Sequence, residues 1–165
     1  MVVEKYNPKW AEQFQTLKEF LEKNTTEYIS IEHVGSTSIP GMNAKPIIDI
    51  DIVVEDTLQF LKLKDELEKI GYVHEGDRGI SGREAFDQEK VPVSIDHHLY
   101  VCVKDNAELK RHIKFRDKLR VTPDLVDEYN KIKEEILAKV GADNRAGYVQ
   151  MKEEEYKWFF EKVLS

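Results

Sequence analysis

The sequence predicts an α/β protein of the α+β kind, with a small mixed, mostly antiparallel sheet covered by helices and a helical bundle at the C-terminal end. Large apolar residues recur at helical spacing in residues 8–22, which indicates an amphipathic helix. Apolar runs typical of strands occupy residues 28–34, 46–54 and 93–103. After residue 105 apolar residues recur only at helical spacing, so we expect a helical tail.

The first elements have clear boundary residues. Asn7 is a good capping residue, and Pro8 suits the first helical position because its missing N–H would have no intrahelical partner there. The first two strands are joined by "GSTSIPGMNAK", residues 35–45, whose glycines and proline mark a connection. We therefore expect a hairpin with a long connection.

The middle of the chain is less regular. Asp56 and Thr57 are expected to cap a helix that Gly71 ends. Residues 72–92 carry a weak pattern and are rich in glycine. Three of these glycines are spaced three residues apart, which differs from the G-x-G-x-x-G dinucleotide fingerprint, and we expect turns at Gly76, Gly79 and Gly82.

The chain is expected to form a single domain, residues 1–165. Its 165 residues are 41% hydrophobic, which suits one compact core. The sheet-bearing part is expected to cover about residues 1–104. The helical tail covers about residues 105–165, with helices at 106–120, 123–140 and 146–163.

Composition narrows the class of function. The formal net charge is -7 and 35% of residues are charged, so the surface is acidic, which disfavours nucleic-acid binding. Cys102, the single cysteine, stands in the apolar string "LYVCV" and is expected to be a buried hydrophobe. Glu4 and Lys5 interrupt the N-terminus before an apolar segment forms, and no stretch is long enough for a membrane span. These features predict a cytoplasmic protein with no membrane partner.

Two carboxylates interrupt the apolar run "PIIDIDIVV". Because strand side chains alternate, Asp49 and Asp51 should lie on one face, about 7 Å apart, with the isoleucines on the other. Two close acids in an apolar strand are unfavourable unless a cation offsets their charge. Mg²⁺ (or Mn²⁺) is the simplest such cation, since it is usually held by one or two carboxylates and substrate phosphates. The alternative is an edge strand with a solvated polar face.

A candidate phosphate cradle precedes this strand. Gly35 directly after a strand lets the backbone approach a ligand, and its neighbours Ser36 and Thr37 add hydroxyls to the exposed N–H groups. A Gly-Ser turn alone is also an ordinary hairpin feature. Because the turn comes just before the acid pair, the expected phosphate site lies beside the expected metal site. This combination predicts a nucleotide site.

The segment "IEHVGSTSIPGMNAKPIIDI", residues 31–50, resembles the GrpB-like family, and its strand, Gly-Ser turn and D-x-D pattern resemble the nucleotidyltransferase superfamily. The match continues in "VEKYNPKW" near the start, in "KFRDKLR" at residues 114–120, and in Tyr148 with Lys152. The resemblance thus spans nearly the whole chain and implies a sheet of nucleotidyltransferase type. One version of the family is fused to dephospho-CoA kinase, which implies a functional link to coenzyme A biosynthesis.

The resemblance also implies further site residues. A third carboxylate on a neighbouring strand usually completes such a site, and Asp96 in "VSIDHHLYV" is the candidate, although family members typically carry histidines in this strand. His98 shares its expected face, and His98 and His33 are each candidates for a metal ligand, a proton carrier or a hydrogen-bonded wall residue. Lys45 and Arg83 are the candidate cations for the triphosphate, with a solvated surface charge as the alternative.

Two arginines mark the first helix of the tail. Arg116 and Arg120 lie one turn apart and share a face, with Asp117 beside them. We expect an ion-pair network that fixes the tail to the sheet, with phosphate binding as the alternative.

These observations predict a metal-dependent nucleotidyltransferase, which moves a nucleoside monophosphate from a nucleoside triphosphate to an unidentified hydroxyl acceptor. In this scheme Asp49, Asp51 and Asp96 are the catalytic carboxylates, and the first two hold the metal. The alternative is a non-catalytic nucleotide- or metal-binding module of the same fold that acts with a partner.

Overall fold

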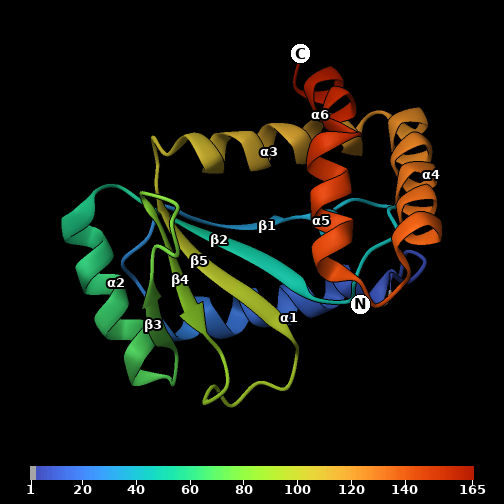
Figure 1. The fold of residues 1–165 in the computed structure, drawn as a ribbon. Helices are drawn as coiled ribbons and strands as arrows, with labels where there is room; N and C mark the ends of the chain where they lie inside the picture. Colours follow the sequence, from blue (N-terminus) through green and yellow to red (C-terminus); the bar gives the residue numbers. More distant parts are fainter. Residues whose placement is uncertain (1–2) are drawn as a thin grey trace.

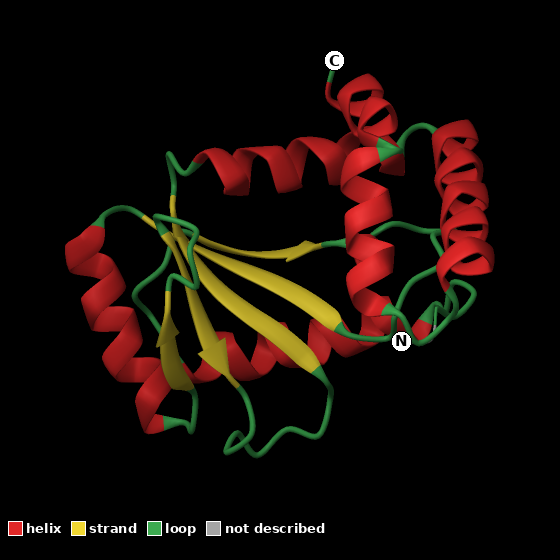
Figure 2. Cartoon of the chain, in the orientation of Figure 1, coloured by secondary structure: helices red, strands yellow, loops and turns green. Residues whose placement is uncertain are grey.

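The computed structural model describes residues 3–165, which fold into one sheet flanked by helices (Figure 1, Figure 2). The strands are β1 (Ser30–Val34), β2 (Ile48–Val54), β3 (Val73–Gly76), β4 (Arg83–Asp87) and β5 (His97–Val103). The helices are α1 (Lys9–Asn24), α2 (Thr57–Lys69), α3 (Ala107–Arg120), α4 (Pro123–Val140), α5 (Arg145–Glu154) and α6 (Lys157–Leu164). A short 3₁₀ turn, η1 (Ser36–Ser38), follows β1.

The sheet is mixed and mostly antiparallel, as predicted. Its strand order is β1-β2-β5-β4-β3. The expected hairpin is present because β1 pairs antiparallel with β2, and the β5–β4 and β4–β3 pairs are antiparallel as well. Strand β2 pairs parallel with β5, so the acid strand is an interior strand, second from one edge of the sheet.

The main core lies on the isoleucine face of the sheet. There β2 packs Ile48, Ile50 and Ile52 against α1 and α2, and all three isoleucine side chains are fully buried. Figure 1 shows α1 and α2 together on this side of the sheet. Apolar positions at helical spacing in the two helices face β-branched residues in the strands, so burial of both surfaces stabilises the layers together.

The C-terminal bundle has its own core and is anchored to the β1–β2 connection. Ile39 and Met42 of this connection are buried among apolar residues of α4, α5 and α6. Helix α3 runs over the other face of the sheet, where Leu109 packs on Val53 and Cys102. Cys102 is the buried hydrophobe that the sequence predicts, and burial raises the pKa of its thiol to about 12.

Side-chain hydrogen bonds cap several helix starts, and the cap at Asp56 confirms the sequence prediction. The carboxylate of Asp56 accepts from the N–H of Gln59, and the amide oxygen of Asn144 accepts from the N–H of Gly147. Pro123 stands at the first turn of α4, as expected. The side chains of Asp56 and Asn144 thus satisfy N–H groups that have no partner inside the helix.

Two parts of the fold differ from the sequence prediction. Residues 72–92 form the strand pair β3 and β4 rather than turns alone, since backbone pairing with β5 compensates for a weak apolar pattern. The expected helix over residues 146–163 is divided into α5 and α6. At the break, the hydroxyl of Tyr156 donates to the carboxylate of Glu135 on α4, 2.9 Å away, which holds the break against the bundle.

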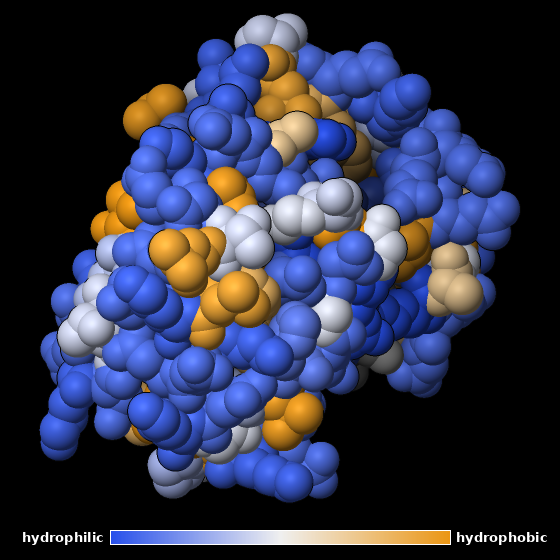
Figure 3. Space-filling model, turned by 90° about the vertical axis from the view of Figure 1, so that its left-hand side faces the viewer, coloured by the Kyte–Doolittle hydropathy of each residue, from blue (hydrophilic) through white to orange (hydrophobic). Residues whose placement is uncertain are grey.

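The surface is largely hydrophilic. In Figure 3 the visible face is mostly polar, with hydrophobic residues in small separate patches. Within residues 3–165, no helix combines the length and the apolar character needed to cross a membrane.

Candidate functional site

The turn after β1 brings backbone and carboxylate into close contact. Gly35 has φ 76° and ψ -178°, a conformation that is essentially restricted to glycine. A β-carbon at this position would stand 2.3 Å from Oδ2 of Asp49, so only glycine leaves room for the carboxylate. The turn closes because the N–H of Ser38 donates to the carbonyl oxygen of Gly35. The sequence therefore fixes an exposed backbone turn directly beside an acid.

The two aspartates of β2 have different surroundings. Asp49 is partly exposed, and its Oδ1 lies 3.1 Å from Nδ1 of His98. Asp51 is 0% exposed, and its Oδ2 lies 3.0 Å from Nδ1 of His112 on α3. Within residues 3–165, Oδ1 of Asp51 has no hydrogen-bond partner. Strand alternation predicts one open cleft for both acids, but only Asp49 lies in a cleft, because α3 covers Asp51.

A small cavity lies beside the Gly-Ser turn. Its volume is about 260 Å³, and it is bordered by η1, β2, β5 and the tail helices α4 and α5. Its lining includes the hydroxyl residues of the turn, the exposed acid of β2 and several cations: Ser36, Thr37, Asp49, His98, Lys45, Lys133, Arg145 and Lys152. Five predicted residues, Ser36, Thr37, Lys45, Asp49 and His98, therefore meet at one cavity.

Lys133 is the most constrained cation of this group. It is 4% exposed, and its Nζ donates to Oγ of Ser36 at 2.9 Å and to the carbonyl oxygen of Asn43. Burial, reinforced by the charge of Lys152, lowers the pKa of Lys133 to about 7. An anion in the cavity would favour the charged ammonium, so this lysine is suited to binding phosphate.

His33 has a structural environment. Its Nε2 lies 2.9 Å from Oγ1 of Thr37, and its ring stacks on Phe14 with centroids 4.6 Å apart. Burial, with smaller effects of the nearby arginines, lowers the pKa of His33 to about 3. The imidazole is therefore neutral at pH 7 and acts as a hydrogen-bonded wall that supports the turn.

Strand β5 places histidine and tyrosine next to the two acids. In the β2–β5 register His98 pairs with Asp49 and Tyr100 pairs with Asp51. Asp96 is exposed and precedes β5, where its carbonyl oxygen accepts from the N–H of Ile48. The structure thus brings His98, rather than Asp96, into hydrogen-bonding distance of an acid.

Arg83 lies on the same sheet face but away from the Gly-Ser turn. Its guanidinium carbon stands 3.5 Å from the ring centroid of Tyr100. Its Nε is buried and, within residues 3–165, has no hydrogen-bond partner. Arg83 is absent from the lining of the small cavity, whereas Lys45 is part of it.

The carboxylates fit a divalent metal only if a ligand completes its coordination. Among residues 3–165, no group of three or more His, Cys, Asp or Glu side chains is arranged to hold a metal ion. Mg²⁺ needs only one or two carboxylates when phosphate oxygens supply further ligands. The unpartnered Oδ1 of buried Asp51 is a further observation that fits a cation, because a buried carboxylate oxygen is costly without a partner.

The predicted ion-pair network is confirmed. Arg116 donates to the carboxylate of Glu32 on β1 at 2.9 Å and to that of Asp117 at 2.9 Å. It also donates to the carbonyl oxygen of His33, and Arg120 donates to that of Ser38. These bonds fix α3 to β1 and to the turn that follows it.

Three residues of this region were not predicted from the sequence. Lys133 could have been noticed in the sequence, because it places a charge on the apolar face of α4. Its neighbours on that face, Tyr129, Ile132 and Ile136, are all buried. His112 and Arg145 have no comparable signal. Their role depends on how α3 and α5 cross the sheet.

The fold and this turn define a protein of nucleotidyltransferase fold. A crystal structure of the Cid1 poly(U) polymerase with MgGTP bound matches with a TM-score of 0.51 at 12% identity, covering 82% of this chain and 46% of that one. At this level of identity the match concerns the fold alone.

The family follows from closer matches. The GrpB protein family model matches residues 1–162, and the chain belongs to the GrpB family. The crystal structure of the conserved protein GrpB from Enterococcus faecalis is 35% identical, with a TM-score of 0.80, and the match covers 99% of this chain and 97% of that one. The UPF0157 protein YqkA of Bacillus subtilis is 39% identical over 150 residues, which are 90% of this chain but only 43% of that protein.

Proposed function

We propose that the protein is a metal-dependent nucleotidyltransferase that moves a nucleoside monophosphate from a nucleoside triphosphate to a hydroxyl acceptor. One observation carries this proposal. The Asp49 carboxylate lies against Gly35, and the next residue, Ser36, accepts a hydrogen bond from buried Lys133. An acid, an exposed backbone turn and a preorganised ammonium thus surround one cavity.

The turn and the cations would bind the phosphates. The Ser36 hydroxyl and the backbone N–H groups of the turn provide donors, and Lys133 and Lys152 provide charge at the same cavity. Lys45 and Arg145 line the cavity from two other directions. Because most of these groups belong to η1, α4 and α5, they would orient the triphosphate with little reorganisation on binding.

Asp49 and Asp51 would hold Mg²⁺ (or Mn²⁺). Asp96, the third carboxylate that the resemblance implies, is exposed and lies outside the lining of the small cavity, so we assign the metal to the two aspartates of β2. When bound, the metal would neutralise phosphate charge and stabilise the charge that develops during transfer. His98 fixes the orientation of the Asp49 carboxylate through its 3.1 Å contact. Asp51 is fully buried and is absent from the lining of the small cavity. Its Oδ2 is held by His112, so Asp51 would reach the metal through its unpartnered Oδ1.

The first test is metal-dependent nucleotide binding. A ligand that binds only the folded state stabilises it, so MgATP or MgGTP at 100 times its Kd should raise the free energy of unfolding by about 2.7 kcal/mol. Asp49→Asn should abolish most of this gain. Asp65→Asn, at an exposed position on α2, is the matched control and should keep it. An equal gain with a chelator present would contradict a metal in the site.

The second test is transfer itself. Wild-type protein should release pyrophosphate from at least one of the four nucleoside triphosphates when cell extract supplies acceptors, and Asp49→Asn should not. A non-catalytic nucleotide-binding module is the second candidate function. It is favoured by the register of β5, where His98 and Tyr100 stand next to the acids instead of a third carboxylate. Mg-nucleotide binding without pyrophosphate release under any condition would support this second candidate.

A further inference from the structure

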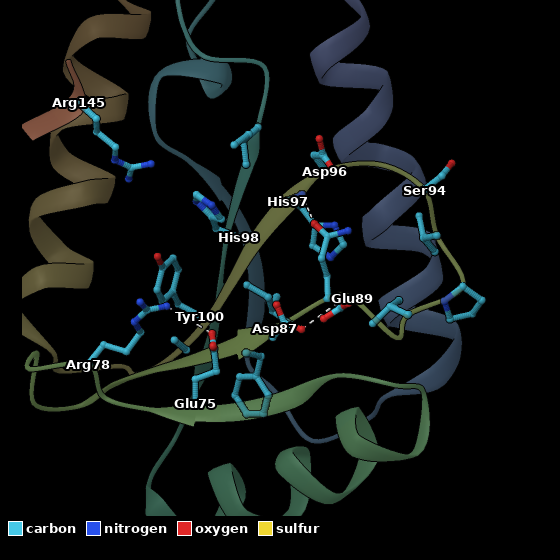
Figure 4. A pocket seen from close by; sticks show the side chains of 18 residues that line it. Glu75, Arg78, Asp87, Glu89, Ser94, Asp96, His97, His98, Tyr100 and Arg145 are labelled. Carbon is cyan, nitrogen blue, oxygen red and sulfur yellow. Dashed lines mark hydrogen bonds and ion pairs between the residues drawn. The ribbon is translucent and has the colours of Figure 1, made fainter. Parts of the chain in front are cut away.

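A second, larger cavity continues from the nucleotide site across the same face of the sheet. Its volume is about 1310 Å³, and it lies over β4, β5 and the connection between them, residues 88–96. Figure 4 shows His98 and Tyr100 on its floor, with Arg145 reaching toward His98 from the neighbouring helix. A cavity of this size exceeds the usual range for a small ligand, so it has room for a molecule larger than one sugar ring.

The two cavities meet at shared residues. Ile47, His98 and Arg145 line both the small cavity beside the Gly-Ser turn and this larger one. His98 is also the side chain that contacts the Asp49 carboxylate. The larger cavity therefore reaches His98, the residue that contacts the acid of the proposed reaction, while Asp49 itself lines the small cavity.

Phosphoryl-group transfer restricts where the acceptor can lie. The attacking and leaving oxygens must stand roughly in line on opposite sides of the phosphorus. The Gly-Ser turn, Lys133 and Lys152 would hold the leaving pyrophosphate on the side of η1, α4 and α5. The attacking hydroxyl must then approach from the opposite side of Asp49, across β5, where the larger cavity lies.

We propose that this cavity, the acceptor cleft, binds the acceptor, and that the acceptor is a hydroxyl-bearing cationic small molecule such as an amino-substituted polyol. The assignment of the acceptor rests on the nucleotidyl transfer proposed above. In that reaction the acceptor hydroxyl loses its proton to solvent or a basic group, its oxygen bonds to the α-phosphorus, and the bond to pyrophosphate breaks. No oxidant or further reactant is needed.

The charge of the acceptor follows from the walls of the cleft. Four carboxylate residues line it, Glu75, Asp87, Glu89 and Asp96. Two arginines line it as well: Arg78, which lies 3.4 Å from Glu75, and Arg145 at the junction with the phosphate cavity. Four carboxylates against two guanidinium groups leave the lining acidic by two charges, with histidine neutral. In Figure 4, Asp96, Asp87 and Glu89 lie on one side of His98 and Tyr100, whereas Arg78 and Arg145 lie on the other, with Glu75 beside Arg78. A nucleic-acid end, with a phosphate at every residue, would be repelled here, whereas an amine would be attracted.

The experiment uses three probes that differ in charge. The diamino cyclitol 2-deoxystreptamine is the cationic polyol, myo-inositol is its uncharged counterpart on a six-membered ring, and a six-nucleotide uridine RNA is the anionic probe. Each is titrated into the full chain with and without MgATP, and amide proton and nitrogen shifts are followed by NMR. The diamine should move signals of β4, β5 and residues 88–96, while myo-inositol and RNA should leave them unchanged.

Charge variants test the walls directly. The double variant Asp87→Asn and Glu89→Gln should weaken diamine binding by about threefold to tenfold, since two exposed charge interactions are lost. The control variant Asp127→Asn and Glu134→Gln removes the same two charges from exposed positions of α4 and should leave the affinity unchanged. Neither pair is part of the proposed phosphate or metal site.

Three results would overturn the proposal. These are equal binding of myo-inositol, RNA binding in the cleft, or no diamine binding while MgATP still shifts signals of the Gly-Ser turn. The last result would refute the acceptor cleft and leave nucleotidyl transfer standing. Diamine binding in the cleft without any nucleotide binding would support the cationic ligand and refute its role as a nucleotidyl acceptor.

Discussion

Gly35 and Asp49 are in contact across the β1–β2 hairpin, so closely that a β-carbon on Gly35 would stand 2.3 Å from Oδ2 of Asp49. The register explains this contact, because Val34 pairs with Asp49 and the chain turns immediately afterwards. The backbone of the turn and the carboxylate therefore form one rigid unit. This unit gives the first prediction.

Gly35→Ala should destabilise the protein by about 2–4 kcal/mol, because it adds a strained backbone conformation to a collision with the carboxylate. Gly41→Ala is the control. Gly41 also has a positive φ, at 84°, but a β-carbon added there would lie 3.6 Å from its nearest neighbour atom. It should therefore show only the conformational cost, about 1–2 kcal/mol. Denaturant unfolding measures both.

The double variant Gly35→Ala with Asp49→Ala separates strain from collision. Removing the carboxylate should restore part of the stability that Gly35→Ala loses, because the two residues are coupled by contact. If the two losses add without interaction, the collision contributes nothing and only backbone strain remains.

The buried ammonium of Lys133 predicts a pH-dependent stability. Its pKa is about 7 in the folded protein, against 10.5 for an unperturbed lysine. Between these values the unfolded chain binds a proton that the folded chain does not, so stability should rise with pH from about 7 to 10.5. The rise should reach about 1.4 kcal/mol per pH unit. Lys133→Met should flatten this part of the profile, and Lys110→Met, at an exposed position of α3, should not.

The same group should control phosphate affinity. Only the protonated ammonium carries charge to a phosphate, so ATP affinity should fall as pH rises above about 7, by at most tenfold per pH unit. Calorimetric titrations between pH 6.5 and 9 measure this. An unchanged profile in Lys133→Met would show that Lys133 does not contact the phosphates.

How far the sequence predicts this site depends on the distance along the chain between its parts. The Gly-Ser turn and the acid strand are close in sequence and could be predicted together, since alternation and turn chemistry are local. Lys133 is 97 positions away from Ser36, and its contact depends on the packing of α4 against the hairpin connection. Helix α3, which covers Asp51, is also distant in sequence, since its residue His112 is 61 positions from Asp51. Alternation predicts the face of a strand but not what is packed on it.

Strand β3 shows the same limit. Only Val73 is a large apolar residue in this four-residue strand, and it is 43% exposed. Its backbone pairs with β4, and such pairing requires no apolar side chain. The pattern of buried residues therefore indicates the central strands clearly and the edge strand poorly.

His33 predicts a loss of stability in acid. Burial lowers its pKa to about 3 in the folded protein, against 6.5 when exposed. As pH falls below 6.5 the unfolded chain gains a proton that the folded chain cannot accept until about pH 3. Stability should therefore fall across this window by up to about 1.4 kcal/mol per pH unit from this group. His33→Gln should be less stable at pH 7 but should show a shallower acid slope in denaturant unfolding.

Arg116 is predicted to be the main polar anchor between α3 and the sheet. Arg116→Met should lower the free energy of unfolding by about 2 kcal/mol, because it leaves Glu32 and the carbonyl oxygen of His33 without their charged donor. Arg111→Met on the same helix removes a more exposed pair with Glu108 and should cost at most about 0.5 kcal/mol. Equal losses in the two variants would contradict the anchoring role.

The last prediction decides between two roles for Asp96. A third catalytic carboxylate would act mainly on the transition state, so Asp96→Asn would lower kcat and kcat/KM together. A wall residue of the acceptor cleft would act on acceptor binding, so the change would raise the KM for the acceptor and leave kcat unchanged. Because the Asp96 side chain is exposed and the residue stands ahead of β5, where its carbonyl oxygen accepts from the N–H of Ile48, we expect the effect on KM to be the larger one. Pyrophosphate release at varied acceptor concentration measures both constants, and Asp49→Asn supplies the reference for a loss of kcat. A fall in kcat as large as that of Asp49→Asn would place Asp96 with the catalytic acids instead.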